Sequence, residues 1–355
     1  MMRKQSSKII SLVAVFILFI LLVACKDKEE NTTGKTDGKE AVEEKVDSEE
    51  EESTAANQNN EDDSEESEDV SFEVKDSKAP KDQGELNVWF KGDVEVVDHT
   101  ITVKGTTNLM PESQLSLDIS PEEGSIIGGD GQTKVENSGA FEIEANVPGD
   151  FEGLLHVELS FEANAQYDDA IVDHYKDGIT GNFARVYYDS YEEATFTKAS
   201  FQKTVVINGE SESFAITEPK WRIPDDIGNP AVWINSKVEK FQDYVVVNIE
   251  SNLVEGTYIN ATADIPNYIT TGFSGSAYTN PDGTAVLYIE DPAKDSRIKD
   301  LSEYEIEIEV DPSNGNNGKQ VLEVYGEAGE KLKGDLVYNT DDGKAISQRL
   351  TIEVE

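Results

Sequence analysis

The sequence predicts an all-β body that consists of two tandem antiparallel β-sandwich domains. Three observations lead to this prediction. Apolar and acidic residues alternate in many short runs, Asp-Gly pairs that suit tight turns lie between the runs, and two parts of the chain match each other at a constant spacing of 144 residues. Each observation points to strands and hairpins rather than to helices.

The alternating runs identify the expected strands. In residues 304–310 every second residue is apolar and the residues between them are glutamates. A period of two with one polar face is typical of an antiparallel sheet that packs on one side. Comparable runs span residues 94–103, 140–147, 155–161, 205–207, 244–249, 285–289 and 350–354. We therefore expect short strands joined by turns such as Asp282-Gly283 and Asp342-Gly343.

The internal repeat sets the expected domain boundaries. With a shift of 144 residues, Trp89 matches Trp233, Asn108 matches Asn252 and Gly139 matches Gly283, among other pairs. The repeat predicts one domain over residues 85–208 and a second over 231–355, each with seven or so strands, the size and spacing of an immunoglobulin-like sandwich. A connector over 209–230 contains Pro219, Pro224 and Pro230, which favour a semi-rigid extended link.

The first 24 residues have the pattern of an export signal. Arg3, Lys4 and Lys8 precede an apolar run over 9–24 that is shorter than the roughly 20 residues a spanning helix needs. The run ends at Cys25, the single cysteine of the chain, and residues 22–25 (Leu-Val-Ala-Cys) resemble the lipobox of bacterial lipoproteins. The resemblance implies a diacylated Cys25 as the mature first residue, and two acyl chains make a stable membrane anchor. A plain signal anchor is the alternative.

An acidic segment follows the cysteine. Residues 26–70 contain 19 acidic and 5 basic residues and no aromatic residue. A segment with this composition buries too little apolar surface to fold, so we expect a disordered linker over 25–82. It is predicted to be a spacer from the membrane, and a binding tail for a basic partner is the alternative.

Two short motifs resemble a known group of proteins. The first, over 250–257 (Glu-Ser-Asn-Leu-Val-Glu-Gly-Thr) and echoed at 106–112, resembles a hairpin in immunoglobulin-like domains of Bacillus-type, Gram-positive surface lipoproteins. The second, over 324–334, resembles an element of the same group, and residues 175–181 keep it loosely. The resemblance implies a fold and a compartment, the outer face of the cell membrane, and no activity.

The composition excludes several classes of protein and site. One cysteine among 355 residues excludes a disulfide framework and a cysteine zinc site, and a net charge of -43 opposes binding of nucleic acid. The histidines, His99, His156 and His174, match no metal or nucleophile motif. We therefore predict no catalytic residue and no cofactor.

Calcium is the one ligand that the acidic turns suggest. Hard cations need several oxygen ligands from one or two loops, and the candidate loops lie at 129–131, 167–169, 225–226 and 340–343. At a junction between the domains, Asp225 and Asp226 are the predicted ligands. The alternative is that these aspartates cap exposed turns.

Trp221 and Arg222 are the predicted interaction residues. They lie in the connector, and Trp221 has no counterpart in the repeat. An aromatic residue beside an arginine is typical of an interface hot spot. Trp221 is expected either to pack at the domain junction or to contact a partner, and the sequence does not decide between the two.

These observations favour a non-enzymatic surface lipoprotein that presents two sandwiches to a protein or cell-wall ligand. An accessory or sensory subunit of a cell-envelope complex is the alternative, and a hydrolase with an unrecognised site is a third class. The ligand, the partner and the process are not predicted.

Overall fold

The structure is a computed structural model that describes residues 78–354 except residues 123, 190 and 270. The described residues belong to one compact unit. The predicted signal peptide, Cys25 and almost all of the predicted acidic linker lie outside them.

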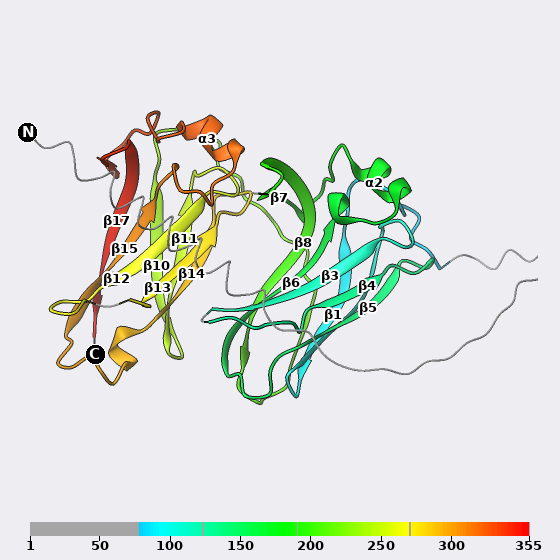
Figure 1. Cartoon of the computed structure of the whole chain (residues 1–355), viewed down its shortest axis with the longest axis horizontal. Helices are drawn as coiled ribbons and strands as arrows, with labels where there is room; N and C mark the ends of the chain where they lie inside the picture. Colours follow the sequence, from blue (N-terminus) through cyan, green and yellow to red (C-terminus); the bar gives the residue numbers. More distant parts are fainter. Residues whose placement is uncertain (1–77, 123, 190, 270, 355) are drawn as a thin grey trace, which may run out of the picture. The chain divides into compact units, whose positions relative to one another are not determined.

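The amino-terminal half of the described chain forms two antiparallel sheets (Figure 1). The four-stranded sheet has the order β5-β2-β1-β9 and the five-stranded sheet has the order β4-β3-β6-β8-β7. The strands are β1 (Phe90–Val97), β2 (Thr100–Thr107), β3 (Gln114–Pro121), β4 (Gly131–Lys134), β5 (Ala140–Asn146), β6 (Gly153–Glu162), β7 (Ala184–Asp189), β8 (Ala194–Ile207) and β9 (Glu212–Ala215).

The carboxy-terminal half repeats this arrangement with one strand fewer. Its sheets have the orders β10-β11-β14 and β13-β12-β15-β17-β16. The strands are β10 (Ile234–Phe241), β11 (Tyr244–Ser251), β12 (Tyr258–Asp264), β13 (Ser274–Tyr278), β14 (Ala285–Glu290), β15 (Glu303–Val310), β16 (Val337–Asn339) and β17 (Lys344–Glu353). We refer to the two halves as the first and second sandwich.

The prediction of an all-β fold is confirmed. In β15 Tyr304, Ile306, Ile308 and Val310 are buried while the glutamates between them are not. The buried apolar side chains form one cluster between Val88 and Ile216 and another between Val232 and Ile352, with no shared residue. Burial of alternate side chains is the main stabilising term in such sheets.

One predicted run is two strands rather than one. Residues 94–103 belong to β1 and β2, which pair through a two-residue turn at Asp98 and His99. Both turn residues have positive φ, 46° and 65°. Two left-handed residues form the tight turn that antiparallel strands favour, and the absence of glycine at this turn hid it in the sequence.

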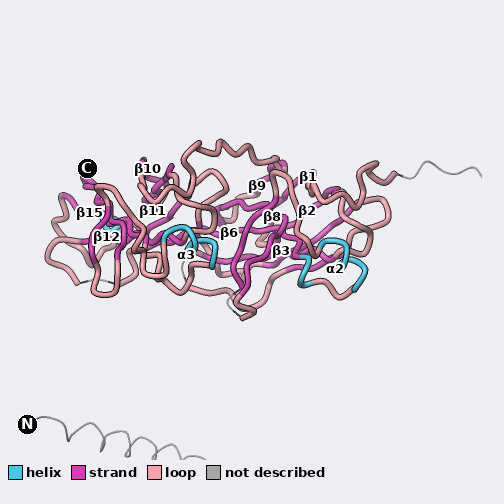
Figure 2. Tube along the Cα trace, turned by 90° about the horizontal axis from the view of Figure 1, so that it is seen from above, coloured by secondary structure: helices cyan, strands magenta, loops and turns pink. Residues whose placement is uncertain are grey.

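Two short helices, α2 (Asp169–Tyr175) and α3 (Lys319–Tyr325), occupy equivalent places after β6 and β15 (Figure 2). His174 lies in the last turn of α2. The last residue of each helix is a buried tyrosine: Tyr175 Oη accepts from the Met110 N–H at 3.1 Å and Tyr325 Oη from the Val254 N–H at 3.0 Å. No helix among the described residues is long and apolar enough to cross a membrane.

A buried asparagine holds the start of the first sandwich. Asn108 is fully buried, its Oδ1 accepts from the Trp89 N–H at 3.0 Å and its Nδ2 donates to the Asn87 carbonyl at 2.8 Å. The Trp89 indole donates to the Asp82 carboxylate at 2.7 Å. We call this group of Asp82, Trp89 and Asn108 the asparagine clamp.

The second sandwich has the same asparagine clamp. Asn252 Oδ1 accepts from the Trp233 N–H at 3.0 Å, and its Nδ2 donates to the Ala231 carbonyl at 3.1 Å. The Trp233 indole donates to Asp226 at 2.9 Å. Every member lies 144 residues after its counterpart in the first sandwich, so the clamp is part of the repeated fold.

The first sandwich extends beyond the predicted range of 85–208 at both ends. Asp82, which was assigned to the linker, accepts the Trp89 indole. Residues 212–215, which were assigned to the connector, form β9 and pair with β1, and Ile216 is buried in the first core. The three prolines that suggested a connector all follow this strand, so the connecting segment is shorter than predicted.

Replacement of the clamp asparagine tests its importance. Asn252→Ala leaves the Trp233 N–H and the Ala231 carbonyl without their partners, so we expect the free energy of unfolding of the second sandwich to fall by about 2 kcal/mol. Urea unfolding followed by tryptophan fluorescence measures the change. Asn260→Ala is the control, because this amide bonds only to an exposed Thr262 hydroxyl. Equal effects of the two variants would show that the clamp does not stabilise the fold.

Candidate functional site

A cleft of about 660 Å³ lies beside strands β6, β7 and β8 of the first sandwich and β13 and β14 of the second. Aromatic side chains contribute to its wall: Tyr187, Tyr188, Trp221, Tyr278 and Tyr288. Hydroxyl and amide side chains lie between them: Ser200, Gln202, Asn280, Asn316 and Gln320. Apolar rings with a few hydrogen-bonding groups are typical of a binding cleft. We call it the aromatic cleft.

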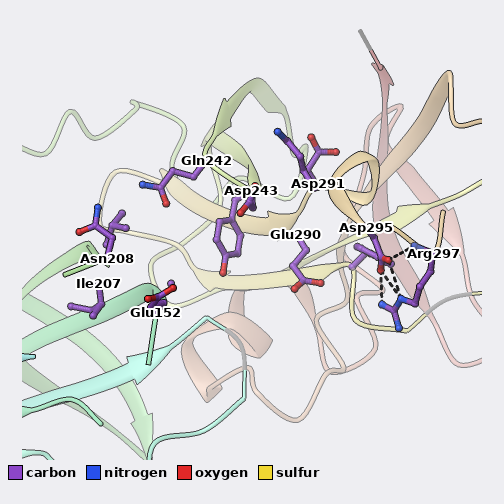
Figure 3. Close-up of a pocket in the computed structure, with 14 residues that line it drawn as sticks. Glu152, Ile207, Asn208, Gln242, Asp243, Glu290, Asp291, Asp295 and Arg297 are labelled. Carbon is purple, nitrogen blue, oxygen red and sulfur yellow. Dashed lines mark hydrogen bonds and ion pairs between the residues drawn. The ribbon is translucent and has the colours of Figure 1, made fainter. Parts of the chain in front are cut away.

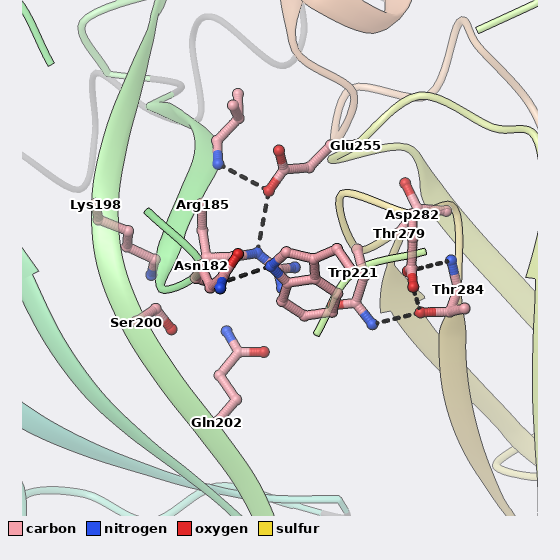
Figure 4. Close-up of polar contacts among 12 residues, drawn as sticks. Asn182, Arg185, Lys198, Ser200, Gln202, Trp221, Glu255, Thr279, Asp282 and Thr284 are labelled. Carbon is pink, nitrogen blue, oxygen red and sulfur yellow. Dashed lines mark hydrogen bonds and ion pairs between the residues drawn. The ribbon is translucent and has the colours of Figure 1, made fainter. Parts of the chain in front are cut away.

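Trp221 contributes to the wall of this cleft (Figure 4). Its indole donates to the Asn182 carbonyl at 2.8 Å, and the Arg185 guanidinium lies 5.0 Å from the ring centroid. Trp221 therefore packs on the first sandwich while part of its ring stays accessible. Trp221 was expected either to pack at the domain junction or to contact a partner. It packs against Asn182 and Arg185, and its place in the cleft wall also leaves it accessible to a ligand.

Arg222 does not line the aromatic cleft. Its side chain is exposed, and its backbone N–H donates to the Asp282 carboxylate at 3.2 Å. Asp282 belongs to the turn before β14, where its other oxygen accepts from the Thr284 hydroxyl at 2.7 Å. The structure therefore separates the two predicted interaction residues, and only Trp221 contributes to the cleft wall.

An ion pair beside Trp221 connects the two sandwiches. Arg185 Nε donates to Glu255 Oε1 at 3.0 Å, and the Val186 N–H donates to the same oxygen at 3.0 Å. Both side chains are mostly buried. Burial raises the pKa of Glu255 above its ordinary value and lowers the pKa of Arg185, and each group partly offsets the other's shift.

The sequence analysis missed this pair. Glu255 lies inside the hairpin motif that carried the resemblance, where Pro111 stands at the equivalent place in the first copy. A carboxylate that occurs at this position in only one of the two copies was the sequence signal that could have identified Glu255.

A cluster of charged and polar side chains on β6 and β8 lies at the cleft. Glu158 accepts from Lys198 at 2.7 Å and from the Ser200 hydroxyl at 2.6 Å, and Gln202 donates to it at 3.2 Å. Burial opposes ionisation of Glu158, but Lys198 and these hydrogen bonds hold its pKa below the ordinary value. Glu158 is therefore ionised, and its carboxylate is bound by Lys198, Ser200 and Gln202.

Asp118 lies directly opposite Glu158 on the neighbouring strand β3. Burial raises the pKa of Asp118 to about 6, and the negative charges of Glu158 and Asp130 add to the shift. Two acidic residues at directly opposite positions repel each other. The wall of the cleft therefore changes its charge in mildly acidic solution.

The predicted calcium ligands do not form a cluster. Asp226 belongs to the asparagine clamp and accepts from Trp233, and Asp225 is exposed. In two other candidate loops Asp130 and Asp168 accept backbone N–H groups, from Ile119 at 2.9 Å and Ala170 at 2.8 Å. Within the described part of the chain no three His, Cys, Asp or Glu side chains converge as metal ligands do.

A second cleft, of about 590 Å³, carries more acidic residues (Figure 3). Its charged residues are Glu152, Asp243, Glu290, Asp291, Lys294, Asp295 and Arg297. Asp295 pairs with Arg297, whose Nε donates to Oδ2 at 2.9 Å. Asp291 is buried and accepts from the Tyr304 hydroxyl at 3.1 Å. These two carboxylates are engaged in structural bonds.

The histidines make structural contacts at separate places. His99 Nε2 lies 3.1 Å from the Phe151 carbonyl, and His174 Nε2 lies 2.6 Å from the Gly84 carbonyl. His156 lines the aromatic cleft and lies between Thr204 and Glu122. Of the three, only His156 contacts a side-chain hydroxyl of the described residues. Its Nδ1 lies 3.0 Å from the Thr204 hydroxyl, and its Nε2 lies beside the Glu122 carboxylate.

No family model matches the chain, and no curated protein matches it. Among solved structures, the chain is similar to the D0-D1 domain of Intimin, with 10% sequence identity and a TM-score of 0.18 over 61% of this chain and 91% of that chain. The all-β assignment rests on the strands and sheets of the chain itself.

Removal of the Glu255 carboxylate tests the ion pair. In Glu255→Ala the Arg185 charge stays buried without a partner, so we expect the free energy of unfolding to fall by about 3 kcal/mol. Differential scanning calorimetry of the full chain measures the change. The matched control is Glu142→Ala, which breaks an exposed pair with Lys104 and should cost less than about 0.5 kcal/mol. A small loss in both variants would show that the buried Arg185 charge does not depend on Glu255.

The pKa of Asp118 predicts a dependence of stability on pH. Because the pKa in the folded protein is about 6 against an ordinary 3.8, the folded state holds its proton more tightly, and stability falls as the pH rises from about 4 to about 6. Asp118→Asn removes this loss. Since the side chain is partly exposed, we expect the variant to gain about 1 kcal/mol at pH 8 and almost nothing at pH 3.5, as measured by urea unfolding. A gain of equal size at both pH values would refute the assignment.

Proposed function

We propose that this chain is a non-enzymatic surface lipoprotein that presents two β-sandwiches on the outer face of the cell membrane, where the aromatic cleft binds a protein or cell-wall ligand. Cys25 carries the lipid anchor in this proposal, and the acidic linker holds the sandwiches away from the membrane. The lipobox and the acidic composition of residues 26–70 support the anchor and the spacer.

The composition of the aromatic cleft is the observation that carries the binding role. Tyr278 is 53% exposed although it belongs to β13 and lines a cleft. Its ring lies 5.5 Å from that of Tyr258 in an edge-on contact, which holds it in place. Exposed, fixed rings beside amide and hydroxyl groups bind ligands at a low cost in side-chain entropy.

Two variants of the full chain test the two parts of the proposal. Cys25→Ala should move the protein from the membrane fraction to the medium or leave it as the unprocessed precursor, because the thiol is the site of acylation. Tyr278→Ala should keep its membrane attachment and lose about tenfold in binding to isolated cell walls or to solubilised envelope proteins, because it truncates a ring in the cleft. Cell fractionation and co-sedimentation give the readouts.

Tyr338→Ala is the control for the cleft. Tyr338 is 38% exposed and does not line the aromatic cleft, so its removal should leave binding unchanged. Unchanged processing together with unchanged membrane attachment of Cys25→Ala would overturn the anchor. Equal binding by the unsubstituted chain, Tyr278→Ala and Tyr338→Ala would overturn the role of the cleft.

A further inference from the structure

The second sandwich has an open sheet edge at the place where the first sandwich holds β9. In the first sandwich β9 pairs with the outer side of β1, with Phe214 opposite Val94. The Ile216 N–H then donates to the Gly92 carbonyl at 2.8 Å. Strand β10 is the counterpart of β1, and no strand of the described residues pairs with its outer side.

The missing strand changes the burial of the residues beside it. Val94 is fully buried under β9, whereas its counterpart Val238 is only half-buried. Val96 is 3% exposed, and its counterpart Lys240 is exposed. Leu350 on β17, at the place that Lys203 occupies in the first sandwich, is also half-buried. The edge therefore leaves apolar surface that β9 covers in the first copy.

One side chain spans part of this edge. Gln348 on β17 accepts from the Ser236 hydroxyl at 2.7 Å, and its Nε2 donates to the Ile234 carbonyl at 3.4 Å. The Ile234 carbonyl therefore faces away from β11. Backbone groups of alternate residues in a strand face the same side, so the outward groups of β10 are those of Ser236, Val238 and Lys240.

The chain contains a second segment whose sequence is similar to that of β9 and the residue after it. Residues 71–74 read Ser-Phe-Glu-Val, and residues 213–216 read Ser-Phe-Ala-Ile. The two segments also hold the same place in the repeat. Each precedes a proline and a glycine that match at the spacing of 144 residues, Pro80 and Gly84 in one copy and Pro224 and Gly228 in the other. Residues 71–74 thus have the pattern of β9 and stand before the first sandwich as β9 stands before the second.

We infer that residues 71–74 of one molecule add to the open edge of β10 in a second molecule, in the register that β9 has on β1. In this register Phe72 lies opposite Val238 and Glu73 lies opposite Lys237. An opposite-charge pair at directly opposite positions stabilises the pairing. Phe72 would cover Val238 as Phe214 covers Val94, and strand addition of this kind is an established way to bind an extended segment.

Charge favours this segment as the occupant of the edge, and its short reach favours a second molecule as its source. The edge carries Lys237, which contacts Glu239, and Lys240, and residues 26–70, which precede the segment, carry a net charge of -14. Four peptide units between Val74 and Lys78 reach at most about 14 Å. With strands about 4.8 Å apart, this is about the width of the first sandwich's own four-stranded sheet. The described chain begins at the side of the first sandwich that lies away from β10 (Figures 1 and 2), so this segment is better placed to meet another molecule than its own second sandwich.

The contact joins different surfaces of the two molecules, the amino-terminal segment of one and the β10 edge of the next. Such a head-to-tail contact repeats from molecule to molecule unless the rotation closes a ring. Anchoring in a membrane raises the local concentration and favours a weak contact of this type. The inference does not depend on the ligand of the aromatic cleft.

Disulfide trapping tests the pairing. One full-length chain carries Glu73→Cys and a second carries Lys237→Cys, and the two are mixed under mild oxidation. We expect a covalent dimer joined through these positions, with a yield at least tenfold above that with Asp93→Cys as the second chain. Asp93 is the counterpart of Lys237 on β1, where β9 already fills the edge. Mass spectrometry of the linked peptides separates this bond from any bond of Cys25.

Phe72→Asp in the first chain should reduce the yield to the level of the Asp93→Cys control, because it places a charge against Val238. Equal yields with Lys237→Cys and Asp93→Cys would overturn the inference. A disulfide that forms within a chain carrying both Glu73→Cys and Lys237→Cys, with none between the singly substituted chains, would also overturn it in favour of pairing within one molecule.

Discussion

The buried asparagine of the clamp is the constraint on which both sandwiches depend. A fully buried amide must satisfy its donors and its acceptor inside the protein, and Asn108 and Asn252 do so by binding the backbone directly before the first strand of each sandwich. The tryptophan of the clamp then fixes an aspartate that precedes the strand. This one group sets where the chain enters the core and where it passes from one sheet to the other after β2 and β11.

The turns from β4 to β5 and from β13 to β14 have the same dependence. Gly139 and Gly283 lie at equivalent turns with positive φ, 79° and 72°. A Cβ atom at these positions would lie 2.6 Å from the Thr107 carbonyl oxygen and 2.2 Å from that of Ser251, the residues directly before the clamp asparagines. Glycine is therefore required where the turn packs against the clamp. The Trp, Asn and Gly residues match between the two copies because each copy requires them for this packing.

The sequence was sufficient to predict the strands whose apolar and polar residues alternate most regularly, such as β15, but it gave no run for β3, β7, β9 or β12. The seven-residue helices α2 and α3 were too short to give a helical pattern, and the turn at Asp98 and His99 lacked glycine. The candidate site was harder to predict. Trp221 stood out because it had no counterpart in the repeat, whereas the contacts of Arg185 with Glu255 join residues 70 positions apart. Periodicity and composition carry no information on such pairs, since they depend on how two folded sheets meet.

The comparison of the two copies separates structural from functional residues. The clamp, the buried tyrosines and the turn glycines occur in both copies, and each of them satisfies buried backbone or allows close packing. Arg185, Glu255 and Trp221 occur in one copy and gather at one place. A buried ion pair is a weak source of stability, because desolvation offsets the attraction between the charges. Its presence at the wall of the aromatic cleft is better explained by the fixed geometry that it gives to Trp221, so the residues by which the copies differ mark the surface on which a binding function can act.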